Sequence, residues 1–306
     1  MKSMDTNREG QENHMQGMLY LCATPIGNLE DITMRVIRTL KEVDVIAAED
    51  TRNTIRLLNH FQIHTPMTSY HEYNKIEKAY DLIGQMKKGK QIALVTDAGT
   101  PGISDPGEEL VRMCHKEGIM VTSLPGAAAC VTALTLSGLP TRRFCFEAFL
   151  PRDKKECAQI LEELKMETRT IVLYEAPHHL RKTLDLLYKT LGNRKLTLCR
   201  ELTKKYETIL VTDLKGAMEY YEKEELRGEF VLVLEGKSRQ EKLSEERRKW
   251  EKLTIQEHME YYLEQGMEKK EAMKRVAVDR KVGKREVYQA LLAEKKETVC
   301  DKKETI

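Results

Sequence analysis

Residues 91–107 read QIALVTDAGTPGISDPG, in which a short apolar run passes directly into a loop of eleven residues rich in Gly, Pro and Asp. The run at 92–96 has the length and composition of a buried β-strand. The glycines of the loop let backbone N–H and C=O groups approach a ligand closely. This stretch therefore predicts a strand whose carboxyl end opens onto a ligand site.

Two further strands are predicted to pass into loops of the same kind. Residues 19–23 are followed by TPIGN at 24–28, and residues 121–124 are followed by PGAAA at 125–129. In open parallel sheets, ligands bind beyond the carboxyl ends of the strands. Three such loops in one half of the chain favour a ligand cleft over three ordinary tight turns.

From residue 18 onward, short apolar runs alternate with amphipathic stretches of helical length. This alternation predicts a parallel, three-layer α/β domain over residues 18–141. Its strands are predicted at 19–23, 44–48, 91–96 and 119–124, and its helices at 32–41, 54–61, 76–87, 108–116 and 127–136.

A second set of elements follows residues 140–143, where we place a domain boundary. It predicts a second α/β domain over residues 142–237. Its strands are predicted at 144–150, 170–174, 196–201, 208–211 and 229–235, and its helices at 154–165, 179–190 and 214–223.

The end of the chain is far more charged, with 17 Lys or Arg and 15 Asp or Glu in residues 241–306. Three helices are predicted there, at 255–265, 269–280 and 284–293, with Gly266 and Gly283 as C-terminal stops. We therefore expect a small helical domain at 238–296, a tail at 297–306 and, before the first strand, a flexible leader at 1–17. Residues 269–285 carry a local net charge of +6, which favours RNA contact over a merely solvated helix face.

Composition excludes several classes of protein. Of 306 residues, 41% are hydrophobic and 33% charged, with a net charge of +2, so neither wholesale disorder nor a generally polybasic protein is expected. The seven cysteines contain no CxxC pair, which predicts free thiols in a reducing cytoplasm and no zinc site. The polar start lacks the apolar core of a signal peptide. The uncharged stretch 119–141 is long enough for a membrane span, but its Pro and Gly residues favour a strand, a turn and a buried helix.

Several catalytic and cofactor motifs are absent from the sequence. The dinucleotide motif GxGxxG does not follow the first strand. Residues 84–91 resemble a phosphate loop, but Gln91 stands where that loop has the Ser or Thr that binds magnesium, and the segment precedes a strand instead of following one. HExxH and GxSxG do not occur. His178 and His179 are adjacent, so on a helix they do not face one another as a metal pair would. Dinucleotide, metalloprotease and serine-hydrolase chemistry are therefore unsupported.

Charged residues also follow predicted strands, in EDTR at 49–52 and RELTK at 200–204. Helix capping by Asp50 or Thr51 and an ion pair between Glu49 and Arg52 would explain part of the first group. Capping does not explain an acidic pair at the end of a buried strand, where an unpartnered carboxylate costs desolvation. We expect these charged groups to meet in a cleft between the two domains.

Several phrases occur in order along the chain: TPIGNLEDI at 24–32, EDTR at 49–52, SYHEYN at 69–74, DAGTPGISDPG at 97–107, LPGA at 124–127, SGLP at 137–140, YEAPH at 174–178 and RELTK at 200–204. Together they resemble the ribosomal RNA small subunit methyltransferase I family of the tetrapyrrole methylase superfamily. The resemblance runs from about residue 18 to residue 236 and continues into the tail, which is similar to the helix-turn-helix domain of that family.

The resemblance implies two α/β domains with S-adenosylmethionine in the cleft between them. It also implies transfer of a methyl group to the ribose 2′-oxygen of a cytidine in the decoding region of 16S rRNA. The expected partners are the 30S ribosomal subunit and a second copy of the chain, in the cytoplasm and without a membrane. The cofactor-binding residues implied are Pro25, Gly27, Asn28, Asp97, Ala98, Gly99, Thr100, Gly102, Ile103, Pro125, Gly126, Ala127, Ala128, Tyr174 and Glu175.

A ribose hydroxyl is a poor nucleophile near neutral pH, so a proton acceptor or a group that stabilises the oxyanion is expected beside it. Our hypothesis is that Glu49 or Glu201 accepts the proton, while Lys204 and Arg52 hold phosphate or ribose. Two alternatives stay open. A corrin or tetrapyrrole methylase would share the cofactor loops without needing a basic tail, and an RNA-binding assembly protein without catalysis would not need intact loops.

Overall fold

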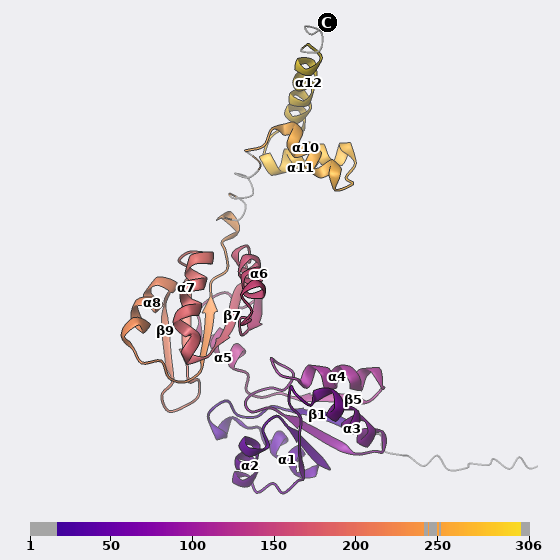
Figure 1. Ribbon diagram of the computed structural model, residues 1–306, viewed down its shortest axis with the longest axis vertical. Coiled ribbons are helices and arrows are strands. Elements are labelled where there is room, and N and C mark those ends of the chain that lie inside the picture. Colours follow the sequence, from indigo (N-terminus) through magenta and orange to yellow (C-terminus); the bar gives the residue numbers. More distant parts are fainter. Residues whose placement is uncertain (1–16, 242–243, 245–249, 251, 301–306) are drawn as a thin grey trace, which may run out of the picture. The chain divides into compact units, whose positions relative to one another are not determined.

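A computed structural model describes residues 17–241, 244, 250 and 252–300 (Figure 1). The chain divides into two compact units. One comprises Met1–Leu164 and Arg169–Glu235 and holds both α/β domains, and the other comprises Lys165–Thr168 and Gly236–Ile306 and holds the tail helices. Most of the predicted leader and residues 301–306 of the predicted tail lie outside the described residues.

The first sheet has five strands, all parallel, in the order β3-β2-β4-β1-β5. This arrangement confirms the parallel sheet that the alternation of elements predicted. The strands are β1 (Met18–Cys22), β2 (Val45–Ala48), β3 (Met67–Ser69), β4 (Gln91–Val95) and β5 (Met120–Leu124), and the helices of this region are α1 (Met34–Glu42), α2 (Thr51–His60), α3 (Lys75–Lys87), α4 (Gly107–Lys116) and α5 (Ala129–Leu136).

Successive residues of a strand point to opposite faces of its sheet, and β4 shows how this builds the core. Ile92 and Leu94 pack into a cluster with α3 and α4, while Ala93 and Val95 pack into a second cluster with α1 and α2. Figure 1 shows these two pairs of helices on opposite sides of the strands. The three layers bring the carboxyl ends of the parallel strands to one edge of the sheet.

The second sheet is mixed, with the strand order β6-β7-β10-β8-β9. Only β6 and β7 are parallel, and the other neighbours are antiparallel. The loop between β8 and β9 is too short for the crossover helix that a parallel pair would need. The strands are β6 (Phe144–Ala148), β7 (Thr170–Glu175), β8 (Lys195–Arg200), β9 (Thr208–Asp213) and β10 (Phe230–Leu234), followed or separated by α6 (Lys154–Lys165), α7 (Leu180–Leu191) and α8 (Leu214–Lys223).

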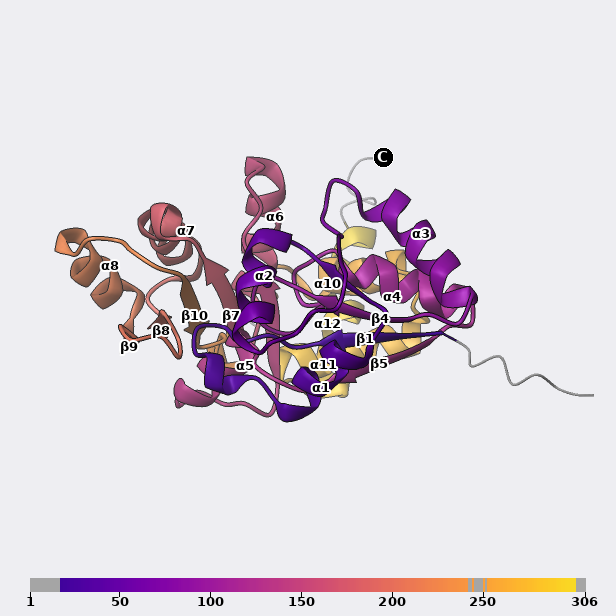
Figure 2. The same ribbon diagram turned by 90° about the horizontal axis from the view of Figure 1, so that it is seen from below.

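Helix α5 follows the first sheet in sequence but packs on the second. Its Cys130, Ala133 and Leu134 lie in one apolar cluster with Val172 of β7 and Val231 of β10. Helices α6, α7 and α8 cover the other face of this sheet, and Figure 2 shows α6 and α7 on the opposite side of β7 from α5. Helix α5, which connects the two sheets in sequence, is therefore part of the apolar core of the second domain.

Three helices form the core of the second unit: α10 (Ile255–Glu264), α11 (Lys269–Arg280) and α12 (Lys284–Cys300). Helix α10 begins with a capping box between Thr254 and Glu257. The predicted role of Gly283 as a helix stop is wrong, because Lys281 takes the left-handed position (φ 53°) that ends α11. The Gly283 carbonyl instead accepts the first N–H bonds of α12, from Glu286 and Val287. Among the described residues, no helix is long and apolar enough to cross a membrane.

Candidate active site

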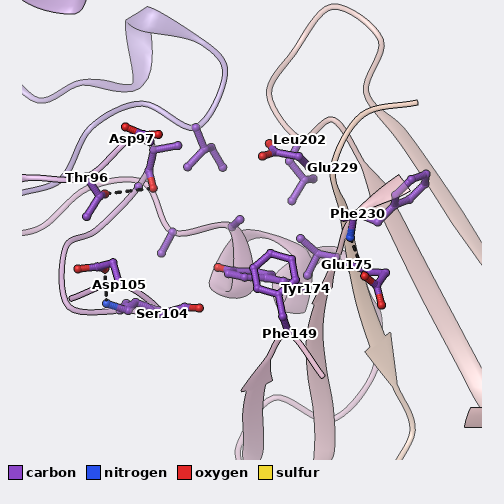
Figure 3. Close-up of a pocket in the computed structure, with 18 of the residues that line it drawn as sticks. Thr96, Asp97, Ser104, Asp105, Phe149, Tyr174, Glu175, Leu202, Glu229 and Phe230 are labelled. Atoms are coloured by element: carbon purple, nitrogen blue, oxygen red, sulfur yellow. Dashed lines mark hydrogen bonds between the residues drawn. The ribbon is translucent and has the colours of Figure 1, made fainter. Parts of the chain in front are cut away.

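A cavity of about 510 Å³ lies in the first unit, where the loops of the first sheet meet the ends of strands in the second (Figure 3). Its volume falls in the range of roughly 300–1,000 Å³ that small-molecule sites occupy. Figure 3 shows Asp97 and Asp105 on one side, with Leu202, Glu229 and Phe230 across from them. The lining residues are Ile26, Glu49, Thr96, Asp97, Ala98, Gly99, Thr100, Ile103, Ser104, Asp105, Ala128, Ala129, Phe149, Tyr174, Glu175, Ala176, Pro177, Glu201, Leu202, Lys204, Glu229, Phe230 and Val231.

A smaller groove of about 300 Å³ adjoins this cavity. Thr96 and Asp97 line both spaces, so the end of β4 forms the wall between them. The other residues of the groove come from the β1 loop and from one face of α2, and they are Thr24, Pro25, Gly27, Leu29, Asn53, Thr54, Arg56, Leu57 and His60.

The predicted cofactor residues fall into three groups. Eight of them line the cavity: Asp97, Ala98, Gly99, Thr100, Ile103, Ala128, Tyr174 and Glu175. Pro25 and Gly27 line the groove, as does Asp97. Asn28, Gly102, Pro125, Gly126 and Ala127 line neither space.

Three members of this last group have visible roles in holding the loops. The Asn28 side chain accepts an N–H bond from Glu30 and caps a short 3₁₀ helix, η1 (Leu29–Asp31). The Gly102 N–H donates to the Asp105 carboxylate, which also accepts from the N–H groups of Ile103 and Gly107. The Ala127 carbonyl accepts a bond of 2.9 Å from the Thr100 hydroxyl.

The loops after β1 and β4 are tied together beside the cavity. Thr24 and Gly99 exchange two backbone hydrogen bonds, of 2.9 and 3.1 Å. The β1 loop also touches a loop of the second domain at Gly27. A Cβ added there would lie 2.4 Å from Lys204 Cγ and 3.0 Å from the Leu202 carbonyl oxygen. The absence of a side chain at Gly27 therefore lets the two domains meet at the edge of the site.

The residues of EDTR are divided between the cavity and the surface. Glu49 lines the cavity, whereas Arg52 does not, and its side chain is 87% exposed. An ion pair between Glu49 and Arg52, the alternative explanation of these charges, does not form in the structure, because Arg52 pairs with Asp50 at 2.7 Å. Asp50 also caps α2 by accepting the Arg52 N–H, so Thr51 is the first helical residue and not the cap. This cap makes α2 begin three residues before the predicted start at residue 54.

Glu49 lies in an acidic environment. Burial raises the pKa of its carboxyl above the ordinary value, and the neighbouring carboxylates of Asp97 and Asp105 raise it further. Asp97 is itself held in place, since its two oxygens accept bonds from the Asp50 N–H and the Asn53 amide. A carboxylate with a raised pKa is a stronger base than an ordinary one.

Glu201 and Lys204 form an ion pair that was not predicted, and Glu229 joins them. Lys204 Nζ lies 2.9 Å from Glu201 Oε1 and 3.2 Å from Glu229 Oε2. The backbone at Glu201 and Thr203 is left-handed (φ 52° and 65°), which costs roughly 1–3 kcal/mol per residue and marks a constrained loop. Burial opposes the shift, but hydrogen bonds from Lys204 and the Glu229 N–H lower the pKa of Glu201.

The lining of the cavity is strongly acidic. Lys204 is the one Lys or Arg among its described lining residues, against six acidic side chains: Glu49, Asp97, Asp105, Glu175, Glu201 and Glu229. Not all of these face the space freely, since Glu175 accepts bonds from the Ala176 N–H and the Thr183 hydroxyl. The balance nevertheless favours a ligand that carries positive charge.

Two aromatic side chains, Phe149 and Tyr174, lie together at the centre of Figure 3, with ring centroids 5.6 Å apart. The Tyr174 hydroxyl accepts the Cys130 N–H, which fixes the ring against α5. Sequence reasoning missed Phe149 because residues 144–150 were predicted as a plain strand. The strand register shifts between Phe146 and Ala148, and Ala148 is left-handed (φ 50°). Glu229 was missed for a similar reason, since it was predicted as the first residue of a strand, whereas β10 begins at Phe230.

Comparison with known proteins adds to this geometry. The profile of the family Tetrapyrrole (Corrin/Porphyrin) Methylases matches residues 18–217. A protein of Halalkalibacterium halodurans named ribosomal RNA small subunit methyltransferase I is 52% identical over 285 residues, covering 93% of this chain and 98% of the relative. The Bacillus subtilis protein of the same name is 50% identical over 274 residues, covering 90% and 94%.

Solved structures share the fold of the first unit. Diphthine synthase aligns with a TM-score of 0.58 at 13% identity, over 72% of this chain and 90% of that one. Uroporphyrin-III C-methyltransferase from Thermus thermophilus, complexed with S-adenyl homocysteine, aligns with a TM-score of 0.51 at 20% identity, over 72% and 97%. At these identities the likeness establishes the architecture alone.

Proposed function

The chain belongs to the tetrapyrrole methylase family and, within it, to the ribosomal RNA small subunit methyltransferase I family, and from this premise we propose that it methylates 16S rRNA. The reaction is transfer of a methyl group from S-adenosylmethionine to the ribose 2′-oxygen of a cytidine in the decoding region. The observation that carries the proposal is the acidic cavity between the two sheets, next to a groove that holds basic side chains.

The cavity fits the cofactor in size and in charge. When bound, S-adenosylmethionine supplies an electrophilic methyl group on a sulfonium cation. Acidic side chains on the lining favour such a cation, and Phe149 and Tyr174 would supply aromatic surface for it. The loop from Asp97 to Thr100 supplies backbone groups for the polar ends of the molecule. These residues are our candidates for cofactor binding.

Of the two candidate bases, the structure favours Glu49. Its raised pKa gives it a greater proton affinity than an ordinary carboxylate has, whereas the Glu201 carboxylate already holds Lys204 and the Glu229 N–H. We assign to Glu49 the removal of the ribose 2′-hydroxyl proton. We assign to Glu201 the positioning of Lys204.

Lys204 stays protonated, because the Glu201 and Glu229 carboxylates raise its pKa although burial opposes the shift. A fixed ammonium group at the edge of the cavity stabilises negative charge that develops on the attacking oxygen. Arg52 lies outside the cavity, so its proposed role is restricted to contact with a phosphate at the surface.

Exposed lysines of the small helical domain are proposed to contact rRNA phosphates. Lys270 and Lys274 of α11 and Lys281 at its end are exposed, and each phosphate contact with a single strand steepens the salt dependence of binding by about 0.7 in the log–log slope. The variant with all three changed to Gln is expected to bind small subunits with a slope shallower by about 2. An unchanged slope would show that this helical domain does not contact the RNA.

The direct test is transfer of tritiated methyl from S-adenosylmethionine to 30S subunits that lack their 2′-O-methyl groups. Label recovered in 2′-O-methylcytidine supports the proposal, and sedimentation equilibrium of the same protein tests the proposed homodimer. Free 16S rRNA in a parallel reaction distinguishes an assembled subunit from naked RNA as substrate. Turnover on a precorrin without label in rRNA would favour the corrin-methylase alternative.

A further inference from the structure

The groove between the β1 loop and α2 differs in charge from the cavity beside it. Arg56 and His60 line it, and its one acidic residue, Asp97, already accepts bonds from Asn53 and the Asp50 N–H. In the described part of the chain, the Arg56 side chain makes no hydrogen bond or ion pair, and the residue is exposed. A guanidinium group without a partner at the edge of a groove is suited to a phosphate.

The shape of the groove follows from helical spacing. Along α2, Arg56 and Leu57 lie three and four residues after Asn53, and His60 lies four and three residues after them, so the four side chains share one face of that helix. Opposite them, Leu29 of the β1 loop is 40% exposed. The groove thus combines an apolar wall with cationic and hydrogen-bonding groups. A binding site for single-stranded RNA combines these two features, because the bases stack on apolar or aromatic side chains while the phosphates bind positively charged groups.

The position of the groove links it to the chemistry. Thr96 and Asp97 form the wall that it shares with the cavity, and Glu49 lies on the cavity side close to Asp97. A strand that places a ribose at this wall must continue away from it on either side. The acidic cavity repels phosphates, whereas the groove attracts them.

We propose that this groove binds the nucleotide next to the methylated cytidine, with Arg56 and His60 on its phosphate and Leu29 and Leu57 against its base. The inference rests on the proposed function for the identity of the RNA. It assigns to Arg56 a positioning role, because the guanidinium holds the strand and does not touch the reacting atoms.

The test compares Arg56→Gln with Arg38→Gln, a matched change of an exposed arginine on α1 that lines neither space. Binding of 30S subunits lacking the modification is measured with S-adenosylhomocysteine present, at several salt concentrations. We expect Arg56→Gln to weaken binding about tenfold and to flatten the log–log salt slope by about 0.7, with Arg38→Gln like the parent. Arg56→Lys is expected to recover most of the slope but less of the affinity, since lysine cannot bind bidentately.

Methyl transfer is measured on the same samples, which separates the two hypotheses. If the parent methylates the subunits but Arg56→Gln matches Arg38→Gln in affinity and slope, the groove proposal is overturned and the proposed function stands. If the parent transfers no methyl group but Arg56→Gln alone loses affinity, the groove still binds RNA and the assigned reaction fails.

Discussion

Replacing Gly27 with alanine tests whether the contact between the β1 loop and the loop at residues 202–204 sets the geometry of the site. The φ angle of Gly27 lies outside the left-handed region, so alanine suffers a steric cost alone. Its Cβ would lie 2.4 Å from Lys204 Cγ, 2.9 Å from Thr203 Oγ1 and 3.0 Å from the Leu202 carbonyl oxygen. Carbon atoms in contact prefer about 3.5–4.0 Å, so the separation from the Lys204 side chain must grow by roughly 1 Å, and the separation from the Leu202 carbonyl must grow by less.

A separation of this size has two expected effects. Overpacking costs about 1–3 kcal/mol of the free energy of unfolding. A displacement of roughly 1 Å between reacting groups lowers the rate about 10²-fold. We therefore predict that Gly27→Ala lowers kcat/KM for methyl transfer to 30S subunits by about 10²-fold, while urea unfolding shows a protein that is still folded.

Gly84→Ala provides the matched control. Gly84 lies inside α3, and nothing lies within 4 Å of a Cβ added there. Alanine in a helix interior is more favourable than glycine by about 1 kcal/mol, so this variant is expected to be slightly more stable and fully active. Normal turnover by Gly27→Ala, or an equal loss in both variants, would refute the idea that the Gly27 contact positions the site.

Three further predictions follow from the site and the tail. Glu49→Gln should lower kcat by about 10²–10⁴-fold and abolish the rise of kcat/KM with pH that titration of this carboxyl produces. Because the raised pKa of Glu49 makes its charged form unfavourable in the folded state, the same variant should unfold at a higher temperature than the parent at pH 7, and this difference should vanish below about pH 4. Lys204→Met should lower kcat by about 10²–10³-fold with little change in cofactor affinity measured by calorimetry, and a large loss of affinity instead would place Lys204 in cofactor binding. Thr254→Ala removes the capping box of α10 and should speed hydrogen exchange of the first-turn amides, consistent with a loss of about 1 kcal/mol, while exchange in α3 stays unchanged.

The sequence was most informative where one physical cause determines a structure. The strands β1, β2, β4 and β5 lie within a residue or two of their predicted positions. For the inner strands β1, β2 and β4 the cause is an apolar run that is buried between the two helical layers. Strand β5 is an edge strand and is largely exposed or half-buried. The edge strand β3 was not predicted, since its three residues, Met-Thr-Ser, carry no such signal.

Features that depend on contacts between distant segments were beyond sequence reasoning. Nothing in residues 127–136 indicates that α5 packs on the second sheet, because its apolar side chains would suit either core. The preference of Arg52 for Asp50 over Glu49 depends on the cap that Asp50 makes. The predicted site loops lie where expected, but which of their residues reach the cavity depends on the turns that Asp105 and Asn28 hold.

The central claim is that the cavity and the groove together direct a methyl group to a ribose oxygen. It is tested most directly by alkaline hydrolysis of 16S rRNA that the protein has labelled with tritiated methyl groups. Alkali cleaves RNA through the free 2′-oxygen, so a methyl group at that position protects the adjacent phosphodiester. Label in an alkali-resistant dinucleotide that begins with cytidine is the predicted result, and label in mononucleotides would show base methylation and contradict the account.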